Sequence, residues 1–310
     1  MAEKIATRQA YGEFLLEKGK TTPNLIVMDG DLSKSTMTHA FSKTFPERFF
    51  NMGIAEQNLF GTAAGLAISG KVVCASTFAM FATGRAYEII RNSIGYTQAN
   101  VKICATHAGL TVGEDGASHQ TFEDIALMRV IPGMTVVNPS DGNSAKILLE
   151  QAVNAQGPYY IRLGRAAVPL IYSPDADLIV GKGNCLRSGR DYTVIATGIM
   201  IHEALKAASI LETRSISLRV IDMHTIKPLD GSIIEKAARE TKGIVIAEEH
   251  SVIGGLGSAV AEYTSAHCPA KIRFIGQNDI FGESGKPDAL LGKYGMTAEN
   301  IVSAIDSFSD

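Results

Sequence analysis

The chain has 310 residues, of which 45% are hydrophobic and 20% charged, and its formal net charge is -3. These totals are typical of a soluble globular protein of one or two domains, and they give no support for nucleic acid or an anionic membrane as a partner. No stretch is apolar over the length that spans a bilayer, and the N-terminus lacks the apolar core of a signal peptide, so a cytosolic protein is expected. The four cysteines show no CxxC pair and no metal-ligand spacing, so no metal site is expected on this chain.

Short apolar runs alternate with helical patterns along the first half of the chain. Strands are expected at residues 25–28, 71–77, 101–106, 134–138 and 159–163. Helices are expected at residues 7–17, 61–70, 82–96, 122–129 and 143–154. This alternation favours a mostly parallel sheet that is covered on both faces by helices.

A second alternation follows a stretch rich in proline and glycine. Strands are expected at 192–196, 217–221, 243–247 and 272–275, and the chain ends in a helix at about 297–305. We therefore predict an α/β fold of two consecutive domains, each a mostly parallel sheet flanked by helices: residues 1–168, a linker at 169–190, and residues 191–310. The glycine turn at 254–257 has the wrong spacing for a nucleotide-binding loop and is interpreted as a strand-to-helix connection.

The stretch from Phe49 to Phe81 combines a carboxylate with aromatic side chains. Glu56 stands at the mouth of a predicted helix, and Phe78 and Phe81 follow the next strand. Such a group suits a flat, basic heteroaromatic ligand, because the carboxylate can hydrogen-bond a ring nitrogen while the aromatic rings stack on its face. The same residues also fit a simpler interpretation, in which Glu56 is a first-turn helix acid and the two phenylalanines are core residues.

Polar residues collect where the predicted parallel strands end, which is where ligands bind in such sheets. They lie at 29–35, at Arg165, and in the glycine-rich loop 107–121 with His107, Asp115 and His119. Histidines in a cleft can donate to hydroxyl groups or shuttle protons near neutral pH. A zinc site is the alternative, but no helical histidine pair or cysteine ligand accompanies them.

These motifs carry a resemblance to a known family. The strongest are His107 with Gly113-Glu114-Asp115-Gly116 and Ser118-His119-Gln120; weaker ones are Ala6-Thr7-Arg8, Gly30-Asp31-Leu32-Ser33-Lys34-Ser35, Gly53-Ile54-Ala55-Glu56-Gln57, Thr77-Phe78 with Phe81, and Leu163-Gly164-Arg165. Over essentially its whole length the chain resembles the C-terminal half of transketolase, which consists of the pyrimidine-binding domain and the small C-terminal domain.

The resemblance implies thiamine diphosphate chemistry, in which the cofactor acts as the electron sink. Glu56 would hydrogen-bond the ring nitrogen of the aminopyrimidine and activate the cofactor, and Phe78 and Phe81 would stack on that ring. Asp31 would lie near the cofactor. The remaining positions would bind a sugar phosphate: Asp115 and His119 at the donor hydroxyls, and Arg8, Ser35, His107 and Arg165 at the phosphate. His107 and His119 would also take part in catalysis.

Three departures from the family pattern stand out. Gly84 occupies the position of a further aromatic residue, and Ala108 follows His107 where an aspartate is common. Because of these two departures, the resemblance does not identify the donor sugar. The family binds the diphosphate through Mg²⁺ at a Gly-Asp-Gly motif followed by an asparagine, and neither 29–31 nor 114–116 is followed by that pattern. The resemblance therefore implies a partner, an N-terminal transketolase subunit that carries the Mg²⁺–diphosphate site, in an assembly with two copies of each chain.

Other functions share this architecture. The β subunit of a 2-oxo acid dehydrogenase E1 has the glutamate but lacks the arrangement of His107, Glu114, Asp115 and His119. A synthase that makes a deoxypentulose phosphate is normally one long chain. A non-catalytic subunit that kept the fold would be free to lose these polar residues. The leading expectation is a two-carbon ketol transfer from a ketose phosphate to an aldose phosphate.

Overall fold

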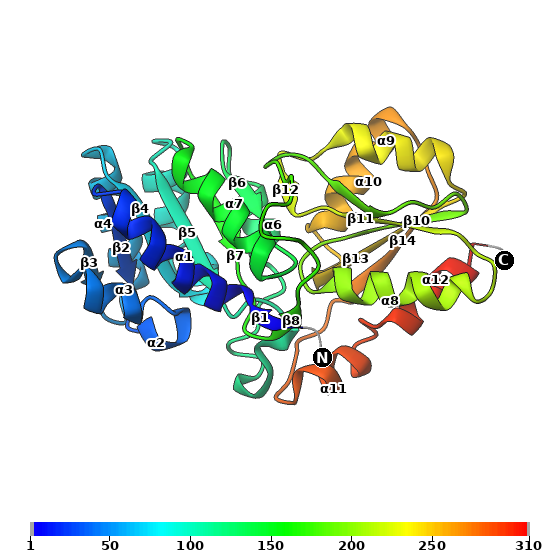
Figure 1. Ribbon diagram of the computed structural model, residues 1–310, viewed down its shortest axis with the longest axis horizontal. Helices are drawn as coiled ribbons and strands as arrows, with labels where there is room; N and C mark the ends of the chain where they lie inside the picture. The colour runs from blue at the N-terminus through cyan, green and yellow to red at the C-terminus, as the bar shows by residue number, and fades with distance from the viewer. Residues whose placement is uncertain (1–2, 309–310) are drawn as a thin grey trace.

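A seven-stranded sheet organises the first half of the computed structural model, which describes residues 3–308 (Figure 1). Its spatial order is β12-β6-β7-β5-β4-β2-β3. The parallel strands are β2 (Leu25–Asp29), β3 (Phe49–Asn51), β4 (Val72–Phe78), β5 (Val101–Thr106), β6 (Thr135–Val137) and β7 (Tyr159–Arg162). The edge strand β12 (Thr225–Lys227) is antiparallel to β6 and comes from the second half of the sequence.

Alternate residues of each strand pack against helices on opposite faces of this sheet. On one face, Leu25 and Val27 pack with the buried side of α1 (Thr7–Thr21) and α7 (Gly142–Asn154). On the other, Ile26 and Met28 pack with α4 (Glu56–Ile68). Both faces are therefore buried, which explains why these strands are continuous apolar runs.

Shorter helical segments occupy the connections of the first half. They are α2 (Ser33–Thr36), α3 (His39–Thr44), η1 (Pro46–Arg48), η4 (Leu110–Asp115) and α6 (Asp124–Arg129). The helix expected at 82–96 is irregular: two π-helical segments, η2 (Phe81–Arg85) and η3 (Ile90–Gly95), flank α5 (Tyr87–Ile89). A π turn contains one extra residue, so the side chains after Phe81 point in directions that a regular α-helix would not give them.

The second half contains a five-stranded sheet in the order β14-β13-β10-β11-β9. The parallel strands are β10 (Tyr192–Ala196), β11 (Leu218–Asp222), β13 (Ile244–Ser251) and β14 (Ile272–Gln277). Figure 1 shows α9 (Gly231–Glu240) and α10 (Leu256–His267) above this sheet and α8 (Met200–Glu212) and α12 (Ala298–Asp306) below it. The prediction of an α/β fold with two mostly parallel, helix-flanked sheets is confirmed.

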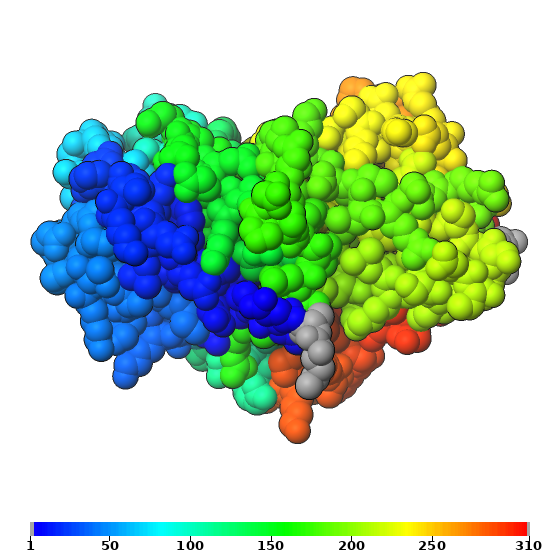
Figure 2. Space-filling view, viewed as in Figure 1, coloured from blue at the N-terminus to red at the C-terminus, as the bar shows by residue number. Residues whose placement is uncertain are grey.

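The segment expected to be a linker, 169–190, is more structured than its composition indicates. Within it, β9 (Asn184–Arg187) joins the second sheet as an antiparallel edge strand on β11. β8 (Ala167–Pro169), which ends at the first residue of this segment, pairs with β1 (Lys4–Ala6). Figure 2 shows β1, in deep blue, at the junction of the two halves. Such short strands are held by hydrogen bonds to a neighbouring strand and contain no apolar run. The sequence pattern therefore does not reveal them.

Candidate active site

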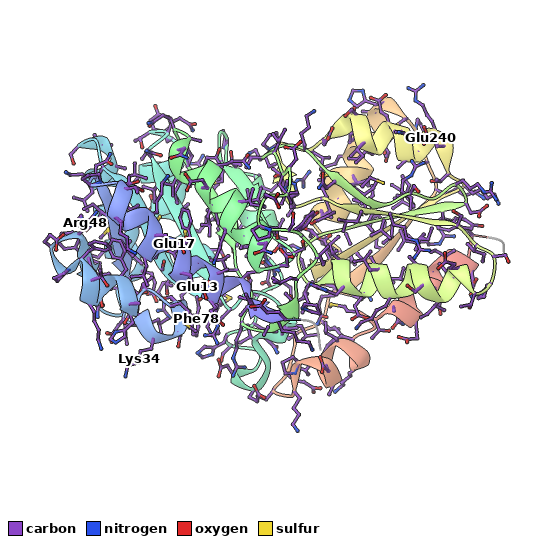
Figure 3. All side chains as sticks on the ribbon, in the orientation of Figure 1. Glu13, Glu17, Lys34, Arg48, Phe78 and Glu240 are labelled. Carbon is purple, nitrogen blue, oxygen red and sulfur yellow. The ribbon has the colours of Figure 1, made fainter. Side chains whose placement is uncertain are left out.

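The expected site residues lie at the carboxyl end of the first sheet. Phe78 ends β4, Thr106 ends β5, and Asp29 ends β2. In Figure 3, Phe78 and Lys34 of α2 lie toward the same lower edge of the first half. The loops that follow these strands meet the first turns of α1 and α4, so this edge gathers side chains from distant parts of the sequence.

Glu56 is the first residue of α4, and its side chain is only 1% exposed. A buried carboxylate needs a partner, and Arg85 supplies it, with 2.9 Å between Arg85 Nη1 and Glu56 Oε2. The guanidinium of Arg85 also lies 5.0 Å from the centroid of the Phe81 ring. Gly84, which contributes no ring, is thus followed by a planar cation that covers Phe81.

Four rings form a cluster that Arg85 joins to this carboxylate. The Phe78 and Phe81 rings are stacked, with centroids 5.9 Å apart and planes at 14°. The His107 ring is stacked on Phe78 with centroids 3.9 Å apart, and His119 meets Phe81 edge-on at 5.3 Å. The structure therefore brings the two phenylalanines and the two histidines together, as an aromatic ligand site requires.

His107 is buried and neutral. Its backbone φ is 56°, a left-handed conformation that is uncommon outside glycine and turns the side chain back toward Phe78. Burial, with the charges of Arg8 and Arg165, lowers the pKa of His107 to about 3. Its Nε2 can therefore accept a hydrogen bond from Arg8 Nη1 at 3.3 Å, while Nδ1 lies 2.9 Å from Thr106 Oγ1.

Two arginines add positive charge at the same place. Arg8 Nη1 donates to the Ser35 carbonyl at 2.7 Å, whereas its buried Nε has no hydrogen-bond partner among the described residues. Burial and the nearby charge of Arg165 lower the pKa of Arg8. Arg165 Nη1 donates to the Val112 carbonyl and, at 2.8 Å, to the exposed Glu114 carboxylate. Like charges held together in this way favour an anionic ligand between them.

The two remaining candidates, Asp31 and Asp115, are exposed at the rim. Asp31 has a φ of 66°, and its carboxylate accepts from Asn51 Nδ2 at 2.8 Å. Asp115 ends η4, in the same loop as Glu114. Neither lies in the cluster of rings.

Asp29, whose role is not evident from the sequence, shapes the loop that carries Asp31 and Ser35. It is fully buried, and its carboxylate accepts from Leu32 N at 2.6 Å, Thr36 Oγ1 at 2.6 Å and Thr38 Oγ1 at 2.9 Å. Burial raises the pKa of this carboxyl group despite these bonds. The sequence feature that could have indicated this role is an aspartate that ends an apolar strand and is followed by two threonines, Thr36 and Thr38.

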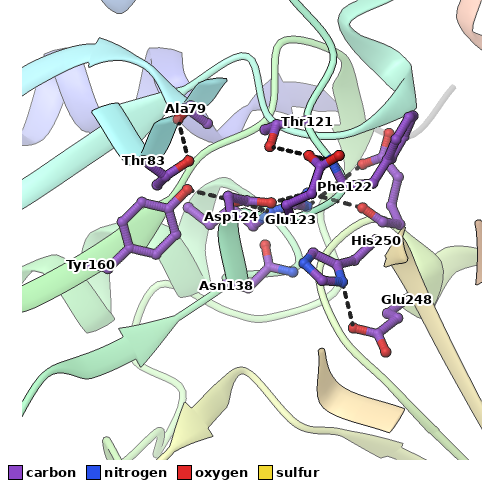
Figure 4. A network of polar contacts seen from close by, with 12 residues as sticks. Ala79, Thr83, Thr121, Phe122, Glu123, Asp124, Asn138, Tyr160, Glu248 and His250 are labelled. Carbon is purple, nitrogen blue, oxygen red and sulfur yellow. Dashed lines mark hydrogen bonds and ion pairs between the residues drawn. The ribbon is translucent and has the colours of Figure 1, made fainter. Parts of the chain in front are cut away.

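A buried ionic network behind the site joins the two halves of the chain. Asp124 accepts from Tyr160 Oη at 2.6 Å and from Arg162 Nε at 2.7 Å, and Arg162 Nη2 donates to the Glu249 carbonyl at 2.9 Å. Figure 4 shows Tyr160 and Asp124 from one half near His250 and Glu248 from the other. His250 accepts the backbone N–H of Ala126 at 3.4 Å, so it acts at the interface of the halves.

The glycine turn 254–257 is a strand-to-helix connection, as expected. The Glu248 carboxylate accepts from the backbone N–H groups of Leu256 and Gly257, each at 2.7 Å. The first turn of α10 is therefore already occupied by an anion from the same chain. Within residues 3–308, no group of three or more histidine, cysteine, aspartate or glutamate side chains has the arrangement of a metal site. In the same part of the chain, no helix is long and apolar enough to cross a membrane.

Comparison with known proteins identifies the family. The model of the transketolase pyrimidine binding domain matches residues 3–170, and that of the transketolase C-terminal domain matches residues 181–301. The chain belongs to the transketolase family. It corresponds to the C-terminal half: it is 38% identical to human transketolase over 309 residues, which are 98% of this chain and 49% of that protein.

Relatives of similar length exist. A putative transketolase C-terminal section from Methanocaldococcus jannaschii is 52% identical over 96% of this chain and 94% of that protein. The solved structure of a split gene transketolase, an inactive beta4 tetramer, is 53% identical, covers 98% of both chains and superposes with a TM-score of 0.90. Transketolase family membership implies dependence on thiamine diphosphate.

Proposed function

We propose that this chain is the C-terminal subunit of a split transketolase. With an N-terminal subunit, it transfers a two-carbon ketol unit from a ketose phosphate to an aldose phosphate. The observation that carries the proposal is the buried Glu56 carboxylate, which Arg85 joins to the stacked rings of Phe78 and Phe81. The relative that is a C-terminal section and the split gene transketolase support the division into subunits.

The residues present fit the pyrimidine part of thiamine diphosphate. A flat aminopyrimidine needs an acceptor that is shielded from water and an aromatic surface, and Glu56 and the phenylalanines offer both. When bound, the cofactor supplies a thiazolium carbon that can act as nucleophile and electron sink. Within residues 3–308 no cluster of three or more histidine, cysteine, aspartate or glutamate side chains is arranged to hold a metal ion. We assign the Mg²⁺–diphosphate site to the partner subunit.

Each side chain of the site has a proposed task. The Glu56 carboxylate holds a proton at the pyrimidine ring nitrogen, and Phe78 and Phe81 fix the plane of the ring. Asp31, near the start of the loop shaped by Asp29, lies near the cofactor. A second group acts on the sugar: His119 and Asp115 at the donor hydroxyls, and Arg8, Ser35, His107 and Arg165 at the phosphate.

The charge state of His107 suits its task. A histidine whose pKa is lowered to about 3 is neutral throughout the physiological range. It can therefore accept from Arg8 and orient that guanidinium, while the two arginines supply the charge for the phosphate. Arg is suited to this because its planar fork can bind two phosphate oxygens at once.

Substitution of Glu56 tests the proposal. In the complex with the partner, Glu56→Gln should keep the fold and lose nearly all two-carbon transfer, because the amide cannot share a proton with the ring nitrogen. Glu88→Gln is the matched control, since Glu88 is an exposed acid on the neighbouring α5. Full turnover by Glu56→Gln would refute the role of Glu56, and an inactive wild-type complex with intact cofactor binding would favour a non-catalytic subunit.

A further inference from the structure

Arg85 presents to Glu56 and Phe81 the features that a bound aminopyrimidine would present. Its guanidinium is flat and carries N–H donors. One donor reaches Glu56 Oε2 at 2.9 Å, and the group lies 5.0 Å from the Phe81 centroid. The π-helical turn η2 determines this position, because Arg85 is its last residue and Phe81 its first.

We propose that Arg85 is an intramolecular substitute for the pyrimidine, which holds Glu56 while the site is free and must leave it when the cofactor binds. This inference rests on the proposed function, in which Glu56 receives the ring nitrogen. The guanidinium of Arg85 occupies Glu56 Oε2 and lies over the Phe81 ring, so a pyrimidine that bonds the same oxygen and stacks on the same ring has to displace it.

The difference in burial between the two residues makes the exchange feasible. Glu56 is 1% exposed, so it is costly to leave this carboxylate without a partner. Arg85 is 51% exposed, so its guanidinium can return to water at little cost. The backbone carbonyl of Arg85 also accepts a hydrogen bond from Gln57 Nε2 at 3.4 Å, and this bond does not involve the guanidinium. The side chain can therefore leave without the helix moving.

The test uses the full chain without its partner and 4-amino-5-hydroxymethyl-2-methylpyrimidine as the probe, with binding followed by NMR titration. Arg85→Met keeps the length of the side chain and its apolar contact with Phe81 but removes the competing charge. It should bind the probe about tenfold more tightly than the wild type, the equivalent of ~1.4 kcal/mol. Arg91→Met is the matched control, because Arg91 is an exposed arginine of the adjacent η3 that pairs with Asn92.

Two further measurements make the inference falsifiable. The double variant Arg85→Met with Glu56→Gln should lose the gain in affinity, since the freed carboxylate is its source. In the wild-type chain, the probe should shift the Arg85 Nε–H resonance toward that of free arginine, with the resonance assigned by Arg85→Lys. Equal affinities of the wild type and a folded Arg85→Met, or a resonance that does not move when the probe saturates the chain, would overturn the role of Arg85.

Failure of this inference is distinguishable from failure of the proposed function. If Glu56→Gln is inactive in the complex but Arg85→Met binds the probe no better than the wild type, only the role of Arg85 is wrong. If Glu56→Gln remains active, the pyrimidine does not depend on Glu56, and the proposed function is wrong as well.

Discussion

Glu249 on β13 accepts the backbone N–H of Thr111 in the site loop, with 2.5 Å between the two atoms. The same carboxylate lies 3.9 Å from Arg162, and a side chain at Gly109 would collide with it, since a Cβ there would be 2.4 Å from Glu249 Cδ. The second half of the chain thus fixes the loop that begins at His107. This contact gives the C-terminal domain a structural task at the site of the first domain.

Glu249→Ala should therefore loosen the site loop and destabilise the fold. The change leaves a buried N–H without an acceptor and removes one of the carboxylates around Arg162, and the two effects together should cost on the order of 2–4 kcal/mol. Urea unfolding of the wild type and of Glu249→Ala measures this loss in the free energy of unfolding. Glu240→Ala is the control, because Glu240 is half-exposed and pairs with Arg219 at the surface. Equal losses for the two variants would contradict the role of Glu249.

The sequence predicted the longer strands of both sheets, because apolar runs are local signals, but not the short strands β3, β9 and β12. Leu25–Asp29 and Val101–Thr106 are such runs. The residues expected at strand ends include Phe78, which ends β4, and His107, which follows β5. The sequence did not predict that β12 crosses into the first sheet, since strand pairing depends on contacts far apart in the chain.

The ion pair of Glu56 with Arg85 could not be predicted from the sequence either. A regular helix after Phe81 would point residue 85 elsewhere, and no residue pattern indicated the π turn. The buried pair of Asp124 with Arg162 was missed for a related reason: each residue looks like an ordinary surface charge until the fold removes both from water.

Asp222 should make the stability of the protein depend on pH. This residue ends β11, is fully buried, and accepts from Ser140 Oγ at 2.8 Å and Tyr172 Oη at 2.9 Å. Burial raises its pKa from the usual 3.8 to about 7. Between these values the unfolded chain has lost the proton that the folded chain still holds. The contribution of Asp222 is therefore fully present below about pH 4 and is lost as the pH rises through about 7.

Asp222→Asn should remove this dependence. The difference in pKa corresponds to roughly 4 kcal/mol, so the wild type should lose up to that amount relative to the variant between about pH 4 and pH 7. Urea unfolding of both proteins across this range measures the difference, and Asp306→Asn, at an exposed pair with Arg214, is the control. Parallel curves for the wild type and Asp222→Asn would show that Asp222 ionises normally.

Arg165→Ala and His107→Ala should each weaken the binding of phosphorylated sugars. Charge-assisted hydrogen bonds are worth ~1.5–3 kcal/mol, so KM for a ketose phosphate should rise by a factor on the order of 10 or more. KM for a donor without phosphate, such as hydroxypyruvate, should change much less. Glu114→Gln should act in the opposite direction, lowering KM for the phosphate by about twofold, because Glu114 holds Arg165 in an exposed pair. Equal effects on both donors would exclude a role in phosphate binding.

The isolated chain should be inactive, and a partner should complete the site. The chain supplies an acceptor, an aromatic surface and an arginine pair, but within residues 3–308 no cluster of three or more histidine, cysteine, aspartate or glutamate side chains is arranged to hold a metal ion. A cofactor held only by its pyrimidine would lack its charged anchor. It would also have to displace Arg85 from Glu56 without help from that anchor.

Calorimetry and a transfer assay test this prediction together. The purified chain, mixed with thiamine diphosphate and Mg²⁺, should show no tight binding of the cofactor by calorimetry and no transfer of a two-carbon unit from a ketose to an aldose, because the pyrimidine contacts alone hold the cofactor only as weakly as they hold the pyrimidine probe. Addition of an N-terminal transketolase subunit that carries the Gly-Asp-Gly motif should restore both, and we expect two copies of each chain in the active complex, since closed two-fold symmetry is the common solution for oligomers. Tight cofactor binding and turnover by the chain alone would overturn the split-subunit proposal.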